Sequence, residues 1–246
     1  MAEPGIKYSN PPIQEVICEL HFAIQEPLSL SRIEKFKGLW LTEYPDQNIT
    51  EEKNVQFQVD PKGMHFEEMK VGHRLICKSS DGSRLVQLSG RFLAVNHLKP
   101  YPGWEEGFRD TILARAKDLE STIEPMPVSR AGLRYINRIE VPDRPLIWEN
   151  WFNFSLPVPK IGDSHLEGFQ MHFERSLPES CRLLVNCLSA QQASQTGTTV
   201  ILDLDVVWQG EPVEHGNILV ILERVHAPHR LVFESYLTDK LRKAFS

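Results

Sequence analysis

The sequence lacks any apolar run that approaches the roughly 20 residues needed to span a bilayer. Its first residues, MAEPGIKYSNPP, also lack the basic segment followed by an apolar segment that marks a secretory signal. Basic residues are not in excess, since 27 Lys and Arg stand against 33 Asp and Glu. The overall basic footprint of nucleic-acid-binding proteins is therefore missing, although a local basic stripe is compatible with this balance. We expect a cytoplasmic protein that does not enter a membrane.

Cysteine is scarce, and no two cysteines form a CxxC pair. The four cysteines each lie inside an apolar stretch: Cys18, Cys77, Cys181 and Cys187. We expect reduced, buried thiols of the kind found in cytosolic proteins. Because burial raises the pKa of a thiol, Cys18 is a poor candidate for a nucleophile.

The motifs of common catalytic sites are also missing. There is no GxSxG, no Walker-type phosphate loop, no GxGxxG and no HExxH. His215, His226 and His229 are close in sequence, but a zinc site needs three or four ligands in a recognisable arrangement. We expect these histidines to be solvated or to cap a helix. We predict no cofactor and no catalytic residue, which favours a protein that is not an enzyme without deciding the matter.

What the sequence does contain is a repeated order of β-type and helical patterns. Residues 13–24 alternate strictly between an apolar side and a mixed polar side, which predicts a strand. A helical pattern (29–45), several short β-type segments (55–98) and an amphipathic helix (103–121) follow. Residues 61–63, Gly72 and Asp81-Gly82 are expected to separate the short β-type segments, and Asp81-Gly82 predicts a tight hairpin turn.

A similar order follows after residue 126. A strand (130–141), a short helix near 146–152, three strands (167–175, 181–192 and 198–208) and a helical C-terminus (216–245) are expected. Pro228 suits the first turn of a second helical segment, so we expect a break or a kink in the C-terminal helix near Ala227.

These patterns predict an α+β fold with an antiparallel sheet and helices packed on one face. The repeated strand-helix-strands-helix order favours an internal duplication, with halves at 1–125 and 126–246 that share one sheet. A saddle-shaped sheet like that of the TATA-binding protein has this order, and a helix-grip sheet is the competing arrangement.

Three arginines in the strand at 130–141 are spaced four residues apart: Arg130, Arg134 and Arg138. In a strand, this spacing places all three on one face. If the first strands of the two halves pair, Glu15 and Glu19 lie beside them and form a ladder of opposite charges. The alternative is an anion-binding surface for phosphate, nucleic acid or an acidic segment of a partner.

Two further groups of residues are candidates for chemistry or binding. Asp203 and Asp205 share a strand face and, with Glu15 and Glu19, could hold Mg²⁺ as in a metal-dependent hydrolase, although a solvated polar face is the default. The loop HLKPYPGWEEGF presents Tyr101 and Trp104. This loop either starts a helix near Gly103 with Trp104 as a hydrophobic staple, or provides an aromatic anchor for a partner protein.

Four blocks carry a resemblance to a known family: YSNPPIQEVICELHF, NHLKPYPGWEEGF, RAGLRYINRIEVP and HRLVFESYLTDKLRKAF. In this order and over nearly the whole chain, they resemble a sporadically distributed family of uncharacterised bacterial proteins of about this length. The resemblance implies a prokaryotic cytosolic protein, often carried on variable genomic regions, and a role in a defence system such as a CRISPR-associated one. It brings no catalytic residue and no ligand.

From these observations we expect a non-catalytic binding or regulatory protein that acts on another protein. The polar sheet face with Arg134, Arg138, Glu15 and Glu19 is the first place to look for the partner. The alternative function is nucleic-acid or nucleotide binding through the arginine-bearing face, and a metal-dependent hydrolase ranks third.

Overall fold

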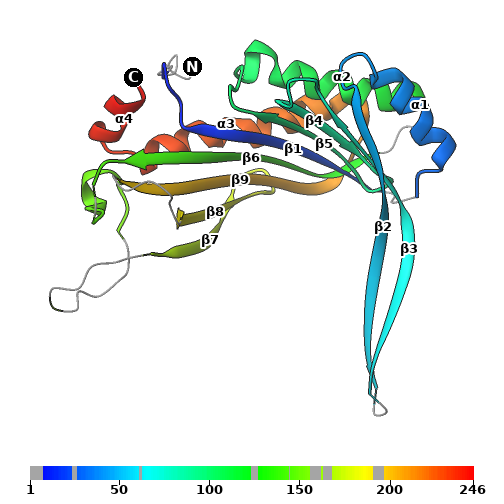
Figure 1. The fold of residues 1–246 in the computed structure, drawn as a ribbon, viewed down its shortest axis with the longest axis horizontal. Coiled ribbons are helices and arrows are strands. Elements are labelled where there is room, and N and C mark those ends of the chain that lie inside the picture. The colour runs from blue at the N-terminus through cyan, green and yellow to red at the C-terminus, as the bar shows by residue number, and fades with distance from the viewer. Residues whose placement is uncertain are drawn as a thin grey trace. The chain divides into compact units, whose positions relative to one another are not determined.

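The structure is a computed structural model that describes residues 8–23, 27–60, 63–122, 127–143, 145–155, 162, 168–190 and 197–246, with side chains described except at 53–71 and 215. The described chain forms an α+β fold with a nine-stranded antiparallel sheet and four α-helices (Figure 1). The strand order is β2-β3-β4-β5-β1-β6-β9-β8-β7. The predicted fold class is confirmed at this level. None of the helices in the described ranges is long and apolar enough to cross a membrane.

The chain divides into two compact units. Unit 1 comprises Met1–Val16, Leu133–Trp208 and Glu223–Ser246, and unit 2 comprises Ile17–Gly132 and Gln209–Leu222. Strands β1 (Ile13–Phe22), β6 (Val128–Val141) and β9 (Thr198–Val213) contribute residues to both units. The strict alternation predicted for the first strand is confirmed, because Val16, Cys18, Leu20 and Phe22 are all buried.

Besides its share of β1, β6, β9 and of helix α3 (Ile218–Tyr236), unit 2 contains two helices and four strands. These are α1 (Leu30–Trp40), β2 (Asp46–Asp60), β3 (Gly63–Lys78), β4 (Arg84–Leu88), β5 (Phe92–Leu98) and α2 (Arg109–Thr122). Helix α1 begins at Ser29, whose hydroxyl accepts a hydrogen bond from the Arg32 amide. Its buried residues Ile33, Phe36 and Trp40 follow helical spacing and fix the face that packs inward.

Strands β2 and β3 form a long hairpin, where the sequence predicted several short segments. Their pairing runs from Asp46↔Lys78 to Asp60↔Gly63, whereas β3 pairs with β4 only over Leu75–Lys78. The interruption expected at Gly72 is a register shift within the hairpin, near Glu52 and Lys53, and does not end the strand. The turn expected at 61–63 lies largely outside the described residues.

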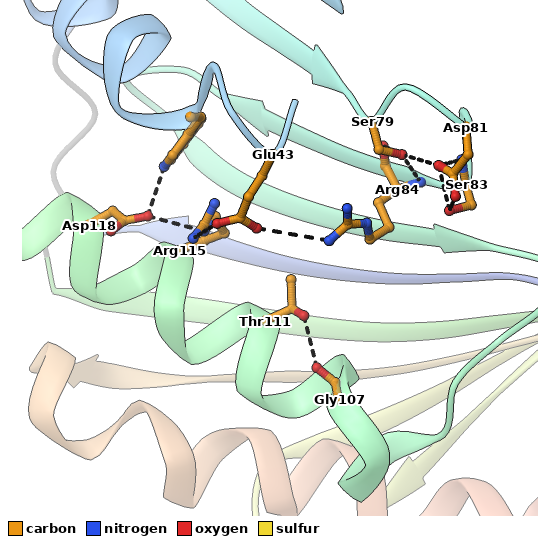
Figure 2. A network of polar contacts seen from close by, with 10 residues as sticks. Glu43, Ser79, Asp81, Ser83, Arg84, Gly107, Thr111, Arg115 and Asp118 are labelled. Carbon is orange, nitrogen blue, oxygen red and sulfur yellow. Dashed lines mark hydrogen bonds and ion pairs between the residues drawn. The ribbon is translucent and has the colours of Figure 1, made fainter. Parts of the chain in front are cut away.

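The Asp81-Gly82 turn between β3 and β4 is confirmed. Gly82 has φ of 72°, a left-handed conformation that glycine adopts without a steric cost. Asp81 Oδ1 accepts hydrogen bonds from the Ser79 hydroxyl at 2.6 Å and the Ser83 amide at 3.0 Å (Figure 2). These hydrogen bonds lower the pKa of Asp81, so the carboxylate that closes the turn stays ionised.

The second helix of unit 2 starts later than predicted. Residues Trp104–Phe108 form a π-helical turn, and the regular helix α2 begins at Arg109. The cause lies at Gly107, whose φ of 149° is not helical and separates the turn from the helix. The apolar stripe of the helix is nevertheless the predicted one, since Phe108, Ile112 and Leu119 are buried.

Unit 1 contains the rest of β1, β6 and β9, two further strands and two helices. These are β7 (Gln170–Leu177), β8 (Cys181–Ala190), α3 (Ile218–Tyr236, from Glu223 onward) and α4 (Asp239–Phe245), and the expected short helix is the single turn Trp148–Asn150. Helix α3 packs against β6, where His229 Nε2 lies 2.6 Å from the Leu133 carbonyl oxygen.

A break or a kink was predicted near Ala227, and the break does not occur there. Helix α3 continues through Pro228, and the break falls between Tyr236 and Asp239. A proline removes one backbone hydrogen bond, but the buried residues Val225 and His229 on either side of it keep the helix packed. Thr238 defines the actual break, since its hydroxyl caps α4 by accepting from the Leu241 amide.

All four cysteines are buried and free of disulfides, as predicted. Burial raises the pKa of both Cys77 and Cys187 to about 12, so these thiols stay protonated at neutral pH.

Candidate functional site

The centre of the polar sheet face in unit 1 is an ion pair between β6 and β9. The guanidinium of Arg134 donates from Nε to Asp203 Oδ1 at 2.8 Å and from Nη2 to Asp203 Oδ2 at 2.7 Å. The Asp203 side chain is 6% exposed, whereas the Arg134 side chain is 43% exposed. The hydrogen bonds that Arg134 donates to Asp203 raise the pKa of Arg134, with smaller contributions from the charges of Asp205 and Glu15. The bidentate geometry fixes the guanidinium and leaves its outer edge toward solvent.

Hydrogen bonds continue from this pair across β8 to β7. Asn186 donates from Nδ2 to Asp203 Oδ2 at 3.2 Å, and His172 Nδ1 lies 2.8 Å from Asn186 Oδ1. With the amide of Asn186 in this orientation, Nδ1 of His172 must be the donor. The strand register produces this series of hydrogen bonds, because Asn186 pairs directly with Asp203 of β9 and with His172 of β7.

This series of hydrogen bonds ends at a second ion pair, which lies at the edge of the sheet. His172 Nε2 lies 3.5 Å from Glu174 Oε1, and Arg182 Nη1 donates to Glu174 Oε2 at 3.1 Å. We define the Arg134 network as Arg134, Asp203, Asn186, His172, Glu174 and Arg182. It links four strands of unit 1 through side chains alone.

The Arg134 network lies on the sheet face opposite α3. Side chains of successive strand residues point to opposite faces, and Tyr135 contacts His229 of α3 with ring centroids 4.8 Å apart. Arg134 therefore points away from that helix. The same alternation holds in β8, where Leu183, Val185 and Cys187 are buried. Tyr135 and Asn137 lie on the side of the sheet that faces α3, where both line a pocket with His229.

Each of the three arginines of β6 has a partner within its own unit. Arg130 Nη1 lies 3.8 Å from Glu19 Oε2 in unit 2, as the predicted charge ladder requires. Arg138 donates from Nε to Glu140 Oε1 at 3.1 Å. The carboxylate bonded to Arg134 is Asp203, while Glu15, which was expected beside the arginines, acts on Arg134 as a nearby negative charge. Asp203 has the shorter side chain, and its strand holds it at the position where it meets the guanidinium.

Asp203, one of the four carboxylates considered for Mg²⁺, is engaged in other hydrogen bonds. Asp203 is bonded to Arg134 and Asn186. No group of three or more His, Cys, Asp or Glu side chains that could hold a metal ion occurs within the described ranges. The third-ranked hydrolase hypothesis therefore has no site geometry to support it in this part of the chain.

The aromatic loop of unit 2 is built into its own packing. Trp104 is buried and contacts Phe108 at a centroid distance of 6.3 Å. Tyr101 is partly exposed and packs edge-on against Phe108 at 5.7 Å and against His97 at 6.3 Å. This matches the helix-entry interpretation, with Trp104 inside and Tyr101 at the surface.

Unit 2 has its own arginine cluster, which we define as Arg115, Glu43, Asp118, Trp40, Tyr44 and Arg84. Arg115 Nη2 donates to Glu43 Oε1 at 3.2 Å, and its Nε lies 3.1 Å from Asp118 Oδ2 without the alignment of a hydrogen bond (Figure 2). The Trp40 indole donates to Asp118 Oδ2 at 2.8 Å.

The guanidinium of this Arg115 cluster is buried. Its central carbon lies 5.8 Å from the Trp40 ring and 5.7 Å from the Tyr44 ring, and Arg84 contacts Tyr44 and Glu43 from a second position. Such a cluster ties α1 and α2 together and presents little of its central cation to solvent.

The sequence did not single out four members of the Arg134 network: Asn186, His172, Glu174 and Arg182. A signal was present, because polar residues alternate with apolar ones in β8 and occupy the same face as Asp203. His229 was expected to be solvated or to cap a helix, and it is buried inside α3 instead. Its place seven residues after Leu222 and four after Val225, both buried, puts it on the apolar stripe of α3.

No family model matches the chain, and no curated protein matches it in sequence.

Proposed function

We propose that this chain is a non-catalytic binding protein that acts through contact with another protein on the Arg134 network. One observation carries the proposal: the charges of this face are matched within the chain and are still accessible. Arg134 is paired with Asp203, Arg138 with Glu140, and Arg182 with Glu174. A face with balanced, fixed charges complements the mixed charges of a protein surface. Binding of a nucleic acid is instead favoured by a surplus of cations on the protein, because their contacts with phosphates release counterions from the nucleic acid.

The sheet edge beside the network suggests how the partner binds. Strand β7 is the last strand in the sheet order, and most of its residues are exposed. Among the described residues no strand pairs with its outer edge. An exposed edge accepts an extended peptide by backbone hydrogen bonds, while side chains on the adjacent face give specificity. The occupant we assign is an extended segment of a partner protein with both acidic and basic residues, read by His172, Glu174 and Arg182.

Two finer interpretations belong to this proposal. The repeated order of elements supports an internal duplication on a saddle-shaped or helix-grip sheet, with halves at 1–125 and 126–246. The sequence blocks that resemble the sporadically distributed bacterial family support a cytoplasmic regulatory role in a defence system.

Position-specific photo-cross-linking in the native host tests the proposal. A benzophenone amino acid replaces Gln170, an exposed residue of β7, or Lys117, an exposed residue of α2 that serves as the matched control. We expect one discrete protein adduct from position 170 that is absent from position 117. Adducts to nucleic acid from position 170, or identical protein adducts from both positions, would reject the proposal. Oligonucleotide binding that falls steeply between about 50 and 200 mM salt would favour the nucleic-acid alternative.

A further inference from the structure

A pocket of about 210 Å³ lies in unit 1 on the α3 side of the sheet. Its lining comes from the segment before β1, from β6 and β9, and from α3, and includes Pro11, Pro12, Tyr135, Leu204, His229 and Phe233. Most of the lining is apolar, and the rings of three aromatic residues (Tyr8, Tyr135 and Phe233) and two prolines take part. This pocket lies on the opposite sheet face from the Arg134 network.

His229 supplies a hydrogen-bond acceptor to this region. Its side chain donates from Nε2 to the Leu133 carbonyl oxygen at 2.6 Å, since a carbonyl can only accept. The remaining ring nitrogen, Nδ1, is buried and has no hydrogen-bond partner in the described part of the chain. Burial lowers the pKa of His229 to about 3, so the imidazole is neutral and Nδ1 carries a lone pair at physiological pH. A buried acceptor without a partner is costly, and a ligand that donates to it removes that cost.

A second acceptor lines the same pocket. Asn137 is 2% exposed, and its Nδ2 donates to the Leu202 carbonyl oxygen at 3.1 Å. Nδ2 also donates to the backbone carbonyl oxygen of Tyr135 at 3.3 Å, so both amide hydrogens are used by backbone carbonyls. The atom of Asn137 that is left to bond a ligand is the amide oxygen, which accepts.

The outer wall of the pocket is fixed. Tyr8 donates to Glu234 Oε1 at 2.8 Å, and Arg242 donates to Glu234 Oε2 at 2.9 Å. Burial, aided by Glu234, raises the pKa of Tyr8 to about 12, so its hydroxyl stays a donor to Glu234. This hydrogen bond holds the segment before β1 against α3, and the pocket is preformed.

We infer that this pocket binds a small planar aromatic molecule whose N–H or O–H group donates a hydrogen bond to His229 Nδ1. The volume accommodates a ligand of one or two fused rings, well below the size of a nucleotide or a typical drug. The rings of Tyr135 and Phe233 favour a flat aromatic ligand. The His229 and Asn137 acceptors select a ligand with donor groups over one with acceptors alone.

Indole and 1-methylindole are the probes, because they share a ring system and differ in the N–H donor. The full chain is labelled with ¹⁵N-histidine, and the ring nitrogens are followed by NMR during titration with each compound. We expect indole to shift the His229 Nδ1 resonance without protonating it. We expect 1-methylindole to bind about three- to tenfold more weakly and to leave Nδ1 nearly unchanged, since a single neutral hydrogen bond is lost.

The comparison uses the wild-type chain, so its result does not depend on whether a variant folds. Tyr135→Leu, which removes an aromatic wall and keeps His229, is expected to weaken indole binding and to preserve the Nδ1 resonance of the free protein. The inference is overturned if indole does not bind, or if both probes bind equally and Nδ1 does not respond. Because this site lies away from the Arg134 network, failure here leaves the cross-linking test of the partner face intact.

Discussion

Arg115 in unit 2 and Arg134 in unit 1 belong to ion pairs built in opposite ways. In the Arg115 cluster the cation is 9% exposed, and its partner Glu43 is 49% exposed. In the Arg134 network the carboxylate of Asp203 is 6% exposed, and the cation is 43% exposed. The first arrangement buries a guanidinium among aromatic rings, where it holds two helices together. The second uses a buried carboxylate to orient a guanidinium that still faces solvent.

The difference separates structural arginines from those available to a partner. The guanidinium of Arg115 fills space beside Trp40 and Tyr44, so its removal leaves a cavity as well as unpaired carboxylates. Arg134 bonds Asp203 through Nε and Nη2, and its Nη1 makes no hydrogen bond with the described residues. A partner can therefore use Arg134 without breaking the bonds that hold it.

The largest expected effect is that of Arg115→Ala. We expect the free energy of unfolding to fall by about 3 kcal/mol, because a buried, paired side chain is lost from the contact between α1 and α2. Arg115→Met keeps much of the packing and should recover part of the loss. Urea denaturation of both variants measures the effect. A loss below about 0.5 kcal/mol for the alanine variant would mean that the cluster is not structural.

Arg134→Ala is expected to cost less, about 2 kcal/mol, because the buried Asp203 keeps only the hydrogen bond from Asn186. The loss of stability is smaller than for Arg115→Ala because Arg134 is partly exposed, and solvent already screens its ion pair with Asp203. The folded variant should lose the cross-link from position 170. Retention of that cross-link at full yield would show that the partner does not use this arginine.

A third prediction concerns pH and uses the buried histidine of unit 1. The pKa of His229 is lowered to about 3 in the folded chain, against about 6.5 when unfolded. The unfolded state therefore takes up a proton that the folded state does not, and stability present above pH 6.5 is lost as the pH falls toward 3. This histidine contributes a slope of up to about 1.4 kcal/mol per pH unit.

His229→Gln is the matched control, because glutamine can keep a donor to Leu133 and does not titrate. Unfolding measured between pH 7 and pH 5 should show a steeper loss for the wild type than for this variant. Parallel pH profiles for the two proteins would contradict a buried, neutral His229.

The smallest expected effect on stability is that of Arg182→Ala. Arg182 is exposed and pairs with a half-exposed Glu174, so we expect a change within about 0.5 kcal/mol. Partner cross-linking from position 170 should nevertheless fall. Arg32→Ala, at an exposed arginine of α1, is the control and should change neither quantity.

Local patterns in the sequence were sufficient for several of these features. The alternation of β1, the turn at Asp81-Gly82 and the shared face of Arg130, Arg134 and Arg138 depend on near neighbours in the chain. The fold class follows from the same patterns.

The features that could not be predicted depend on distant residues. Asp203 lies 69 positions from Arg134, and only the sheet order and register decide that it, rather than Glu15, bonds the guanidinium. The length of the β2–β3 hairpin depends on the pairing of the two strands. Gly72 was expected to end a strand, but a register shift in the pairing lets β3 continue through it. His229 is buried because Leu133 offers it a carbonyl from another element.

A charge swap at the exposed end of the Arg134 network tests most directly whether the network is a surface for a partner protein. Glu174→Arg combined with Arg182→Glu keeps an ion pair between β7 and β8 and reverses the charges shown to a partner. We measure the yield of the protein cross-link from position 170 together with the free energy of unfolding. We predict unchanged stability and loss of the cross-linked partner. A swapped protein of unchanged stability that still gives the same adduct at full yield would contradict this prediction.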